Sequence, residues 1–352
     1  MKKTTFFILA LISSSFMFSQ EEEVPKNKFS FTGSVDTYFK RNISAPSQAL
    51  LDENGAPYFV TPTTAFANRN GFGLGMANIV VGYQGETVGF VADLGFGPRA
   101  EDAVFLSVGS SNIVNQLYMY WNVSDNVKLT IGNFNTFLGY EVISPIGNFN
   151  YSTSYMFSYG PFSHTGLKAD IALGDFSLML AVMNPTDYTE INFDDSYTFG
   201  GQLGYKGQFL NVLYGDQLKG IPTFQIDFTG GLDLDESFFL GLNATYNDTN
   251  NTSFYGVALY PQYKLKEAFT LGARVEYFAE TDGGVGALGA YDPEGDAAVF
   301  AATLTGSYSV GSLTIKPELR LDSASEDSFV NNDLESTQSL SSFLVAAIYK
   351  FN

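Results

Sequence analysis

Several residue types are absent or scarce in this chain, and each shortage excludes a class of site. Cysteine is absent from the 352 residues, which excludes disulfides, thiolate metal sites, cysteine nucleophiles and a lipid-modified cysteine anchor. Basic residues number 18 against 37 acidic ones, a net charge of −19. So acidic a chain repels phosphates, which excludes nucleic acid as a partner. Beyond the N-terminus, no apolar run reaches the ~18 residues of a spanning helix.

The first residues have the composition of a secretory signal peptide. Lys2 and Lys3 form the basic end, the segment from Phe6 to Ile12 forms an apolar core, and Ser19 is a small residue before a cut. We predict cleavage between Ser19 and Gln20, with residues 1–19 as the signal and residues 20–28 as a charged periplasmic leader. Loss of the two lysines would leave a net charge of −21.

What the chain has in abundance is strict alternation of apolar and polar residues. In the stretch SLTIKPELRLD, residues 312–322, Leu313, Ile315, Pro317, Leu319 and Leu321 hold one parity, and Thr314, Lys316, Glu318, Arg320 and Asp322 hold the other. This pattern predicts a strand with one oily and one charged face. A soluble protein would expose the charged face, whereas a membrane barrel would expose the oily face and enclose the charges.

Similar alternating blocks recur along the chain between breaks of two kinds. Short breaks fall near residues 84–86, 123–126, 174–175, 206–207, 233–236, 264–267 and 310–311. The breaks between them are mostly long and polar, at residues 41–70, 97–110, 139–162, 185–195, 281–295 and 323–338, with two short ones near 218–221 and 247–251. We count 16 strands over residues 29–352, with 14 as the alternative, because boundaries read this way slip by about 2–4 residues. The pattern predicts an all-β, up-and-down antiparallel barrel with short periplasmic turns and long extracellular loops.

Aromatic residues decide which face looks outward. They gather at the ends of the apolar parity, where the interfacial girdles of a bilayer would lie: Phe29, Phe39, Tyr83, Phe96, Tyr197, Tyr205, Phe224, Tyr246, Phe269, Tyr277, Tyr349 and Phe351. A soluble β-sandwich is the competing interpretation, with the aromatics as ordinary edge packing. The other parity carries many small and polar residues, so the lumen of a barrel this wide should stay open to water.

One part of the chain resembles a known family. The matching pieces are LTIGNFNTFLGYEVI (residues 129–143), SPIGNFNYS (144–152) and PFSHTGLKA (161–169). They resemble the putative β-barrel porin-2 family of OmpL-like outer-membrane barrels. The resemblance implies an outer-membrane channel for small solutes, and it names no substrate.

The long break at residues 139–162 is rich in aromatic residues and punctuated by glycine. A loop this apolar is unfavourable in solvent. We predict that it folds into the lumen and narrows it, by analogy with the third loop of general porins. The alternative is that it packs over the mouth of the barrel or against a neighbouring subunit.

Charged side chains of the inward parity would line such a pore. The predicted pore-lining and constriction residues are Asp36, Lys40, Asp93, Glu141, His164, Lys168, Asp170, Asp227, Arg274, Glu276, Lys316, Glu318, Arg320 and Lys350. Cations on the last strands facing carboxylates such as Glu141 and Asp170 would set a transverse field that orients solutes and discriminates ions. Local pairing of Lys316, Glu318 and Arg320 with neighbouring strands is the alternative.

The remaining motifs carry little chemistry. His164 is the only histidine, and Ser163 beside it would point to the opposite face of a strand. We therefore predict no enzyme, and a structural role for His164 in fixing the returning loop. No cofactor or dedicated metal site is predicted, because the acidic loops lack the spacing of a calcium site.

The expected function is a porin for passive diffusion of small hydrophilic solutes or ions. The alternative is a non-channel outer-membrane barrel with an adhesion or surface-structural role through its acidic loops. The expected partners are outer-membrane lipids, lipopolysaccharide and the solutes themselves. A homotrimer is an open option, because porins are often trimers and no interface stands out in the sequence.

Overall fold

The structure, a computed structural model, describes residues 28–351. The predicted signal peptide and the leader before Lys28 lie outside the described residues. The main strands are β1 (Lys28–Asn42), β4 (Gly71–Gln84), β5 (Val88–Phe96), β6 (Val114–Ser124), β7 (Val127–Asn135), β8 (Ser163–Leu173), β9 (Phe176–Met183), β10 (Thr198–Tyr205), β11 (Gln208–Leu218), β12 (Ile221–Asp233), β13 (Phe238–Thr249), β14 (Thr252–Lys266), β15 (Phe269–Thr281), β16 (Ala297–Val310), β17 (Leu313–Ala324) and β20 (Ser339–Phe351).

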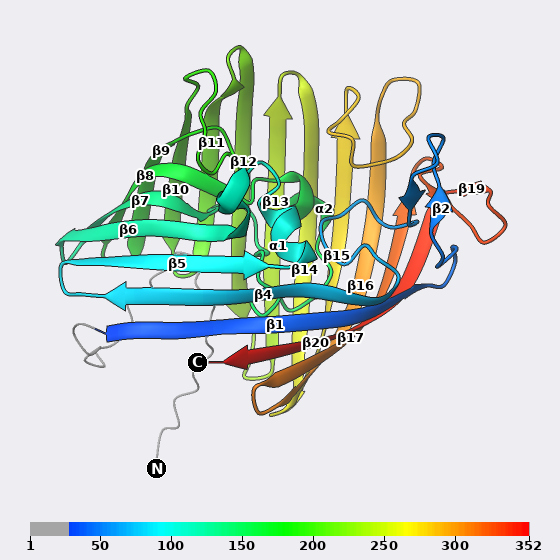
Figure 1. The fold of residues 1–352 in the computed structure, drawn as a ribbon, viewed down its shortest axis with the longest axis horizontal. Helices are drawn as coiled ribbons and strands as arrows, with labels where there is room; N and C mark the ends of the chain where they lie inside the picture. The colour runs from blue at the N-terminus through cyan, green and yellow to red at the C-terminus, as the bar shows by residue number, and fades with distance from the viewer. Residues whose placement is uncertain (1–27, 352) are drawn as a thin grey trace.

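These sixteen strands form one closed antiparallel barrel (Figure 1). Strands that follow one another in the chain pair along the wall. The ring closes where β1 pairs with β20, with Gly33 opposite Phe351 at one end and Asn42 opposite Ser342 at the other. The predicted fold class and the count of 16 are therefore confirmed, and the alternative of 14 is wrong.

The connections alternate between the two ends of the barrel as the sequence predicts. Short turns such as residues 125–126, 174–175 and 206–207 join the strands at one end, which we call the short-turn end. Longer segments leave the other, long-loop end and carry β2 (Leu50–Leu51), β3 (Pro57–Tyr58), β18 (Phe329–Val330), β19 (Ser336–Thr337), α1 (Pro98–Ala103), the 3₁₀ helix η1 (Gly109–Ile113) and α2 (Tyr155–Tyr159). No helix within residues 28–351 is long and apolar enough to cross a bilayer.

The barrel wall turns its apolar parity outward. In β17, Leu319 and Leu321 are 49% and 46% exposed, whereas Lys316, Glu318 and Arg320 between them are buried. A strand in a soluble protein would show the reverse order. The charged face of residues 312–322 therefore points into the barrel, and the apolar face points outward.

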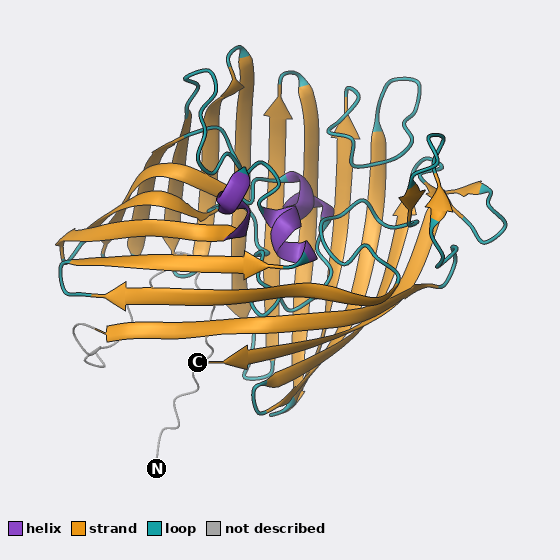
Figure 2. Ribbon diagram, viewed as in Figure 1, coloured by secondary structure: helices purple, strands orange, loops and turns teal. Residues whose placement is uncertain are grey.

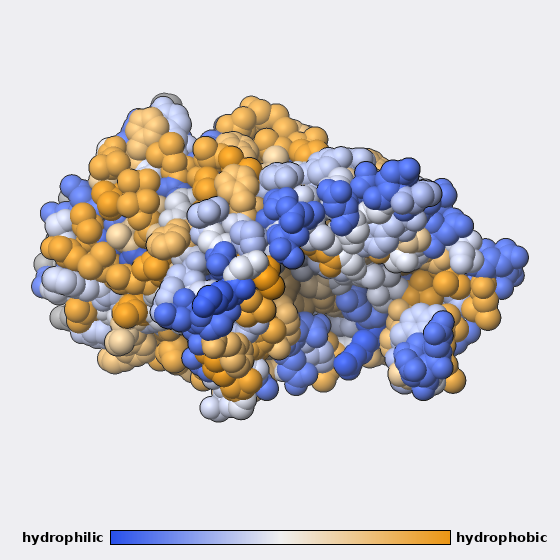
Figure 3. Space-filling model, turned by 90° about the horizontal axis from the view of Figure 1, so that it is seen from above, coloured by the Kyte–Doolittle hydropathy of each residue, from blue (hydrophilic) through white to orange (hydrophobic). Residues whose placement is uncertain are grey.

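Outward aromatic residues lie near the strand ends, as a membrane barrel requires. Of those predicted from the sequence, the following are 39–68% exposed: Phe29, Phe96, Tyr197, Tyr205, Phe224, Tyr246, Tyr277 and Tyr349. In Figure 3 apolar side chains cover much of the left part of the visible face, and hydrophilic side chains gather on the right, toward the end where β2 and β19 lie. This separation fits an apolar wall with polar loops beyond it.

Loops fill much of the interior toward the long-loop end. Tyr155 and Met156 of α2 pack with Leu288, from the loop after β15, against Phe278 of the wall. The two α-helices lie within this packed interior (Figure 2), where α2 contacts β14. The sequence predicted a water-filled lumen narrowed by residues 139–162, whereas in the structure the loop after β15 also enters the interior. The small inward side chains of the wall leave space, and the chain's own loops occupy part of it.

Candidate functional site

The segment that joins β7 to β8, residues 136–162, folds into the barrel and is called the inner loop. Its ends meet where the N–H of Thr136 donates to the carbonyl of Phe162 (3.0 Å). His164 Nε2 lies 2.9 Å from the hydroxyl of Thr136, which accepts the N–H of Leu138 (3.1 Å). His164 is fully buried, with its ring 5.2 Å from that of Phe137. These contacts place the histidine at the base of the loop, where it supports the first turn.

Asp187, in the loop between β9 and β10, holds the returning end of the inner loop. Its Oδ1 accepts the N–H groups of Phe162 (2.7 Å) and Ser163 (2.9 Å). Burial raises the pKa of Asp187 to about 7, against the lowering effect of these two hydrogen bonds. The attachment of the loop therefore depends on a carboxyl group that titrates near neutrality.

Two carboxylates of the barrel wall bind the main chain of the inner loop. Glu276 on β15 and Glu318 on β17 are 0% and 2% exposed. Each accepts two consecutive N–H groups: Glu276 from Tyr155 (3.0 Å) and Met156 (2.9 Å), and Glu318 from Tyr151 (2.9 Å) and Ser152 (3.2 Å). The first pair opens α2, where N–H groups have no partner inside the helix. The carboxylates thus satisfy donors that the loop cannot satisfy itself.

Cations of the wall bind the carbonyl groups of the same loop. Arg274 on β15 and Lys316 and Arg320 on β17 are at most 5% exposed. The contacts run from Arg274 to Ser152 (2.6 Å), from Arg320 to Thr153 (2.8 Å), and from Lys316 to Pro145 (3.3 Å) and Asn148. Wall charges of both signs therefore hold the inner loop through its backbone, whatever its side chains are.

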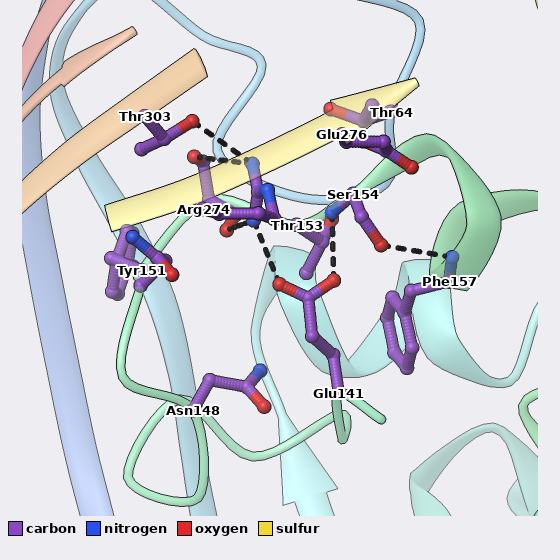
Figure 4. Close-up of polar contacts among 12 residues, drawn as sticks. Thr64, Glu141, Asn148, Tyr151, Thr153, Ser154, Phe157, Arg274, Glu276 and Thr303 are labelled. Carbon is purple, nitrogen blue, oxygen red and sulfur yellow. Dashed lines mark hydrogen bonds and ion pairs between the residues drawn. The ribbon is translucent and has the colours of Figure 1, made fainter. Parts of the chain in front are cut away.

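One ion pair links the loop directly to the wall, as Figure 4 shows. Arg274 Nη1 lies 2.7 Å from Glu141 Oε1, and both side chains are almost fully buried. The other Glu141 oxygen accepts the N–H of Ser154 (2.7 Å), and the Ser154 hydroxyl accepts the N–H of Phe157 (3.0 Å). Arg274 also donates to Thr303 (3.2 Å) on β16. A buried ion pair of this kind is costly to break, because removing one partner leaves the other charge unpaired.

These contacts differ from a field of cations facing carboxylates across open water. Glu141 and Arg274 form a direct ion pair, and Lys316, Glu318 and Arg320 form hydrogen bonds with the loop. Arg320 also pairs with Asp322 on its own strand (2.8 Å). The physical reason is proximity: a backbone folded inside the lumen brings dipoles closer to the wall charges than the far wall can bring opposite charges.

Bulky loop side chains rest on glycines of the wall. Four loop side chains lie so close to a wall glycine that a β-carbon there would overlap them: Phe137 on Gly200, Tyr140 on Gly241, Phe149 on Gly272 and Met156 on Gly256. Tyr140 also stacks on Tyr260 of β14 at 4.1 Å between ring centroids. The glycines bring the loop closer to the wall than any other residue would permit.

A cavity of about 1400 Å³ extends from the short turns to the inner loop. Its lining begins at residues such as Asp125 and Asp175 near the short-turn end and reaches Glu141 and Asn148 of the loop. Sites that enclose one small molecule are typically about 300–1,000 Å³. The lumen on this side of the loop is therefore a wide, mixed polar and apolar chamber.

Comparison with known proteins decides the family. Residues 28–351 match the family described as "Putative beta-barrel porin-2, OmpL-like". The chain belongs to this family. No curated protein matches the chain. The protein is thus a porin-type barrel that spans the outer membrane, with membership extending over the whole of the described barrel.

Solved structures similar to this porin-2 barrel are outer-membrane proteins of low sequence identity. The channel DcaP of Acinetobacter baumannii has a TM-score of 0.57 at 15% identity, over 93% of this chain and 98% of that one. An anion-selective porin from Comamonas acidovorans has a TM-score of 0.57 at 10% identity, over 93% and 100%. The trimer form of OmpT from Vibrio cholerae has a TM-score of 0.54 at 11% identity, over 93% and 100%. At such identities the likeness concerns the fold alone.

The predicted pore-lining residues of the porin-2 barrel fall into three groups. Glu141, Asp170 and Lys316 line the large cavity. Lys40, Glu318 and Arg320 line a pocket of about 10 Å³ beside the inner loop. Arg274, Glu276 and His164 are fully buried against the inner loop itself. The remaining five lie along the inner wall. Three are carboxylates that accept hydrogen bonds: Asp36 from the N–H of Met76 and the hydroxyl of Tyr151, Asp93 from Asn78 and Asn115, and Asp227 from the N–H of Gly139 and from Asn211 and Asn243. Lys168 pairs with Asp170, and Lys350 is half-buried near the end of β20.

The predicted pore-lining set left out several charged residues of this site, including Arg99 and Asp322. Arg99 in α1 donates to the carbonyls of Ile143 (2.7 Å) and Tyr151 (3.2 Å) and lies 4.3 Å from the ring centre of Phe66. It belongs to a loop, where strand parity gives no signal. The alternation placed Asp322 on the charged parity with Arg320, but the predicted pore-lining set did not include it.

Proposed function

We propose that this outer-membrane barrel is a passive diffusion channel for small hydrophilic solutes and ions, narrowest at the inner loop. The observation that carries the proposal is the cavity of about 1400 Å³ inside a closed barrel, which reaches from the short turns to Glu141 and Asn148. We take the short-turn end as periplasmic, as in other barrels of this type. Membership of the porin-2 family and the porin-type fold support this proposal.

The cavity favours cations over anions. Its lining includes three basic residues, Lys128, Lys206 and Lys316, and six acidic ones, Glu86, Asp125, Glu141, Asp170, Asp175 and Asp233. Excess negative charge on the walls of an enclosed channel raises the local concentration of cations. The channel from Comamonas acidovorans is described as anion-selective, so we expect the two barrels to differ in sign of selectivity.

Single-channel recording in planar lipid bilayers tests this function. We expect stepwise conductance from the purified protein and, under a potassium chloride gradient, a reversal potential of the sign set by potassium. Replacing Asp125 and Asp233 together with Asn should shift that potential toward zero. Glu335→Gln, in an exposed loop beyond the barrel, is the matched control and should leave it unchanged.

The inner loop provides a second arm of the same test. Glu276→Gln combined with Glu318→Gln weakens four charge-assisted hydrogen bonds to the loop backbone. We expect larger and noisier current steps, because the loop is then held less firmly in the lumen. Absence of conductance from correctly inserted protein, in the original and in this variant, would contradict the channel and favour a surface role for the loops.

A further inference from the structure

The chamber below the inner loop has an aromatic wall. Five of the aromatic rings that line it are Phe209 on β11, Phe239 on β13, and Phe137, Tyr140 and Phe149 of the inner loop. Two come from β11 and β13, which are separated by β12 in the barrel wall, and three come from the inner loop. All five line the same cavity, and we call them together the aromatic wall.

Each ring of the aromatic wall has a glycine behind it. A β-carbon at Gly204 would lie 2.9 Å from the ring of Phe209, and one at Gly200 would lie 2.6 Å from the ring of Phe137. The other three rings overlap the β-carbon position of their glycines: Phe239 at Gly231, Tyr140 at Gly241 and Phe149 at Gly272. Phe149, Phe209 and Phe239 line the cavity with one side against a glycine, whereas Tyr140 also stacks on Tyr260 and Phe137 is only 7% exposed.

Polar groups flank the aromatic wall on both sides. Lys128 and Asp170, on β7 and β8, line the cavity before it, and Ser307 and Thr314, on β16 and β17, line the cavity after it. Side-chain amides of Gln202 on β10 and of Gln262 on β14, which lies opposite Phe239, also line the cavity. An apolar aromatic surface bordered by a few polar groups is the usual composition of a small-molecule site.

We infer that the aromatic wall is a binding surface for neutral saccharides. This inference rests on the proposed channel function and specifies its solute. A pyranose ring has an apolar face of C–H groups and an equator of hydroxyls, so it can stack on an aromatic ring and hydrogen-bond sideways to amides, hydroxyls and carboxylates. The excess of acidic over basic residues in the lining opposes sugar acids and leaves neutral sugars as the matching class.

Titration of the open channel with maltotriose, a neutral linear saccharide, tests this inference. We expect a saturable decrease in conductance as maltotriose is added. Phe209→Ala and Phe239→Ala each remove one ring from the barrel wall without altering the inner loop. Each should raise the half-blocking concentration of maltotriose about fivefold, the effect of losing one stacking contact. Phe224→Ala, which removes an outward ring that is 39% exposed, should leave it unchanged.

The outcomes separate this inference from the channel itself. A poly(ethylene glycol) of matched size should lower conductance without saturation; equal saturable block by that polymer would overturn the saccharide site. Conductance without saturable block by maltotriose, or block that both Ala variants leave unchanged, would overturn it as well. Calorimetric titration of the detergent-solubilised protein gives an independent readout: maltotriose binding without conductance would retain the site and reject the channel.

Discussion

At the scale of single residues, glycines on the inward parity decide how near the inner loop comes to the wall. Gly272 of β15 lies under the ring of Phe149, and Gly241 of β13 lies under Tyr140. In a strand, glycine adds no packing of its own and marks close approach of another group. The rings of the inner loop therefore pack directly on the backbone at these glycines, where any larger side chain would displace them.

Gly272→Ala should destabilise the barrel because its new β-carbon would overlap the ring of Phe149. We expect the free energy of unfolding to fall by about 1–3 kcal/mol, the usual cost of overpacking. Urea titration in detergent micelles measures it. Gly201→Ala on β10 is the matched control, since no atom lies within 4 Å of its β-carbon position. Equal losses in the two variants would show that the ring moves aside freely.

The inward glycines also mark how far the sequence could predict the site. The inward parity of Arg274, Glu276, Glu318 and Arg320 follows from alternation, which is a local property of a strand. Their partners in the inner loop lie 120–167 residues away in the chain for the hydrogen bonds that reach its backbone. No local pattern encodes such pairings. Inward glycines opposite an aromatic loop are a signal that could have predicted them.

At the scale of secondary-structure elements, the barrel was predictable and its filling was predictable only in part. Period-two alternation indicates most of the strands, and turns such as residues 174–175 and 206–207 carry glycine at positive φ. The long loops lack a period. The sequence predicted from their aromatic content that residues 139–162 would turn inward, but it gave no sign that residues 282–296 would also bury Ala287 and Leu288 inside the barrel.

Attachment of the inner loop should weaken as the pH rises from about 4 to about 7. Asp187 has a pKa of about 7 where it accepts the N–H groups of Phe162 and Ser163, against a usual value of 3.8. The attached loop therefore binds a proton more tightly than the detached loop, so attachment is favoured fully at low pH and loses stability as Asp187 ionises.

Hydrogen exchange of the Ser163 amide measures this effect. Protection should decrease between pH 4 and pH 7 after correction for intrinsic exchange rates. Asp187→Asn removes the titrating group but keeps an acceptor, so its protection should be constant over the same range. A pH dependence that persists unchanged in Asp187→Asn would assign the effect to another group.

At the scale of the whole molecule, the barrel inverts the arrangement of a soluble protein. Leucines and aromatic rings of the wall face outward, and charged residues face an interior shared by loops and a large cavity. Alternation alone could not determine this, since it serves a sandwich equally well. The aromatic residues near strand ends and the alternation of short and long connections resolved it, because both reflect the bilayer that surrounds the barrel.

Leu319→Lys should destabilise the folded barrel in phospholipid vesicles. Leu319 lies in the middle of β17, opposite Leu304 and Phe343, and is 49% exposed on the outward face. A lysine at the bilayer midplane costs about 2–4 kcal/mol. Thr314→Lys, which points into the cavity, should cost far less. Urea unfolding in vesicles compares the two, and similar losses would contradict the assignment of the outward face to lipid.

The contacts of Glu276 and Glu318 with the inner loop impose an order on biogenesis. The loop leaves the ribosome long before β15 and β17, yet those strands supply the carboxylates and the cations that hold it. During synthesis and export the loop must therefore travel without its anchors. Narrowing of the pore is accordingly a late event of assembly, and a polypeptide cut short before β15 would carry a loop that keeps its contacts with Asp187 and Gly241 but lacks the carboxylates and cations of β15 and β17.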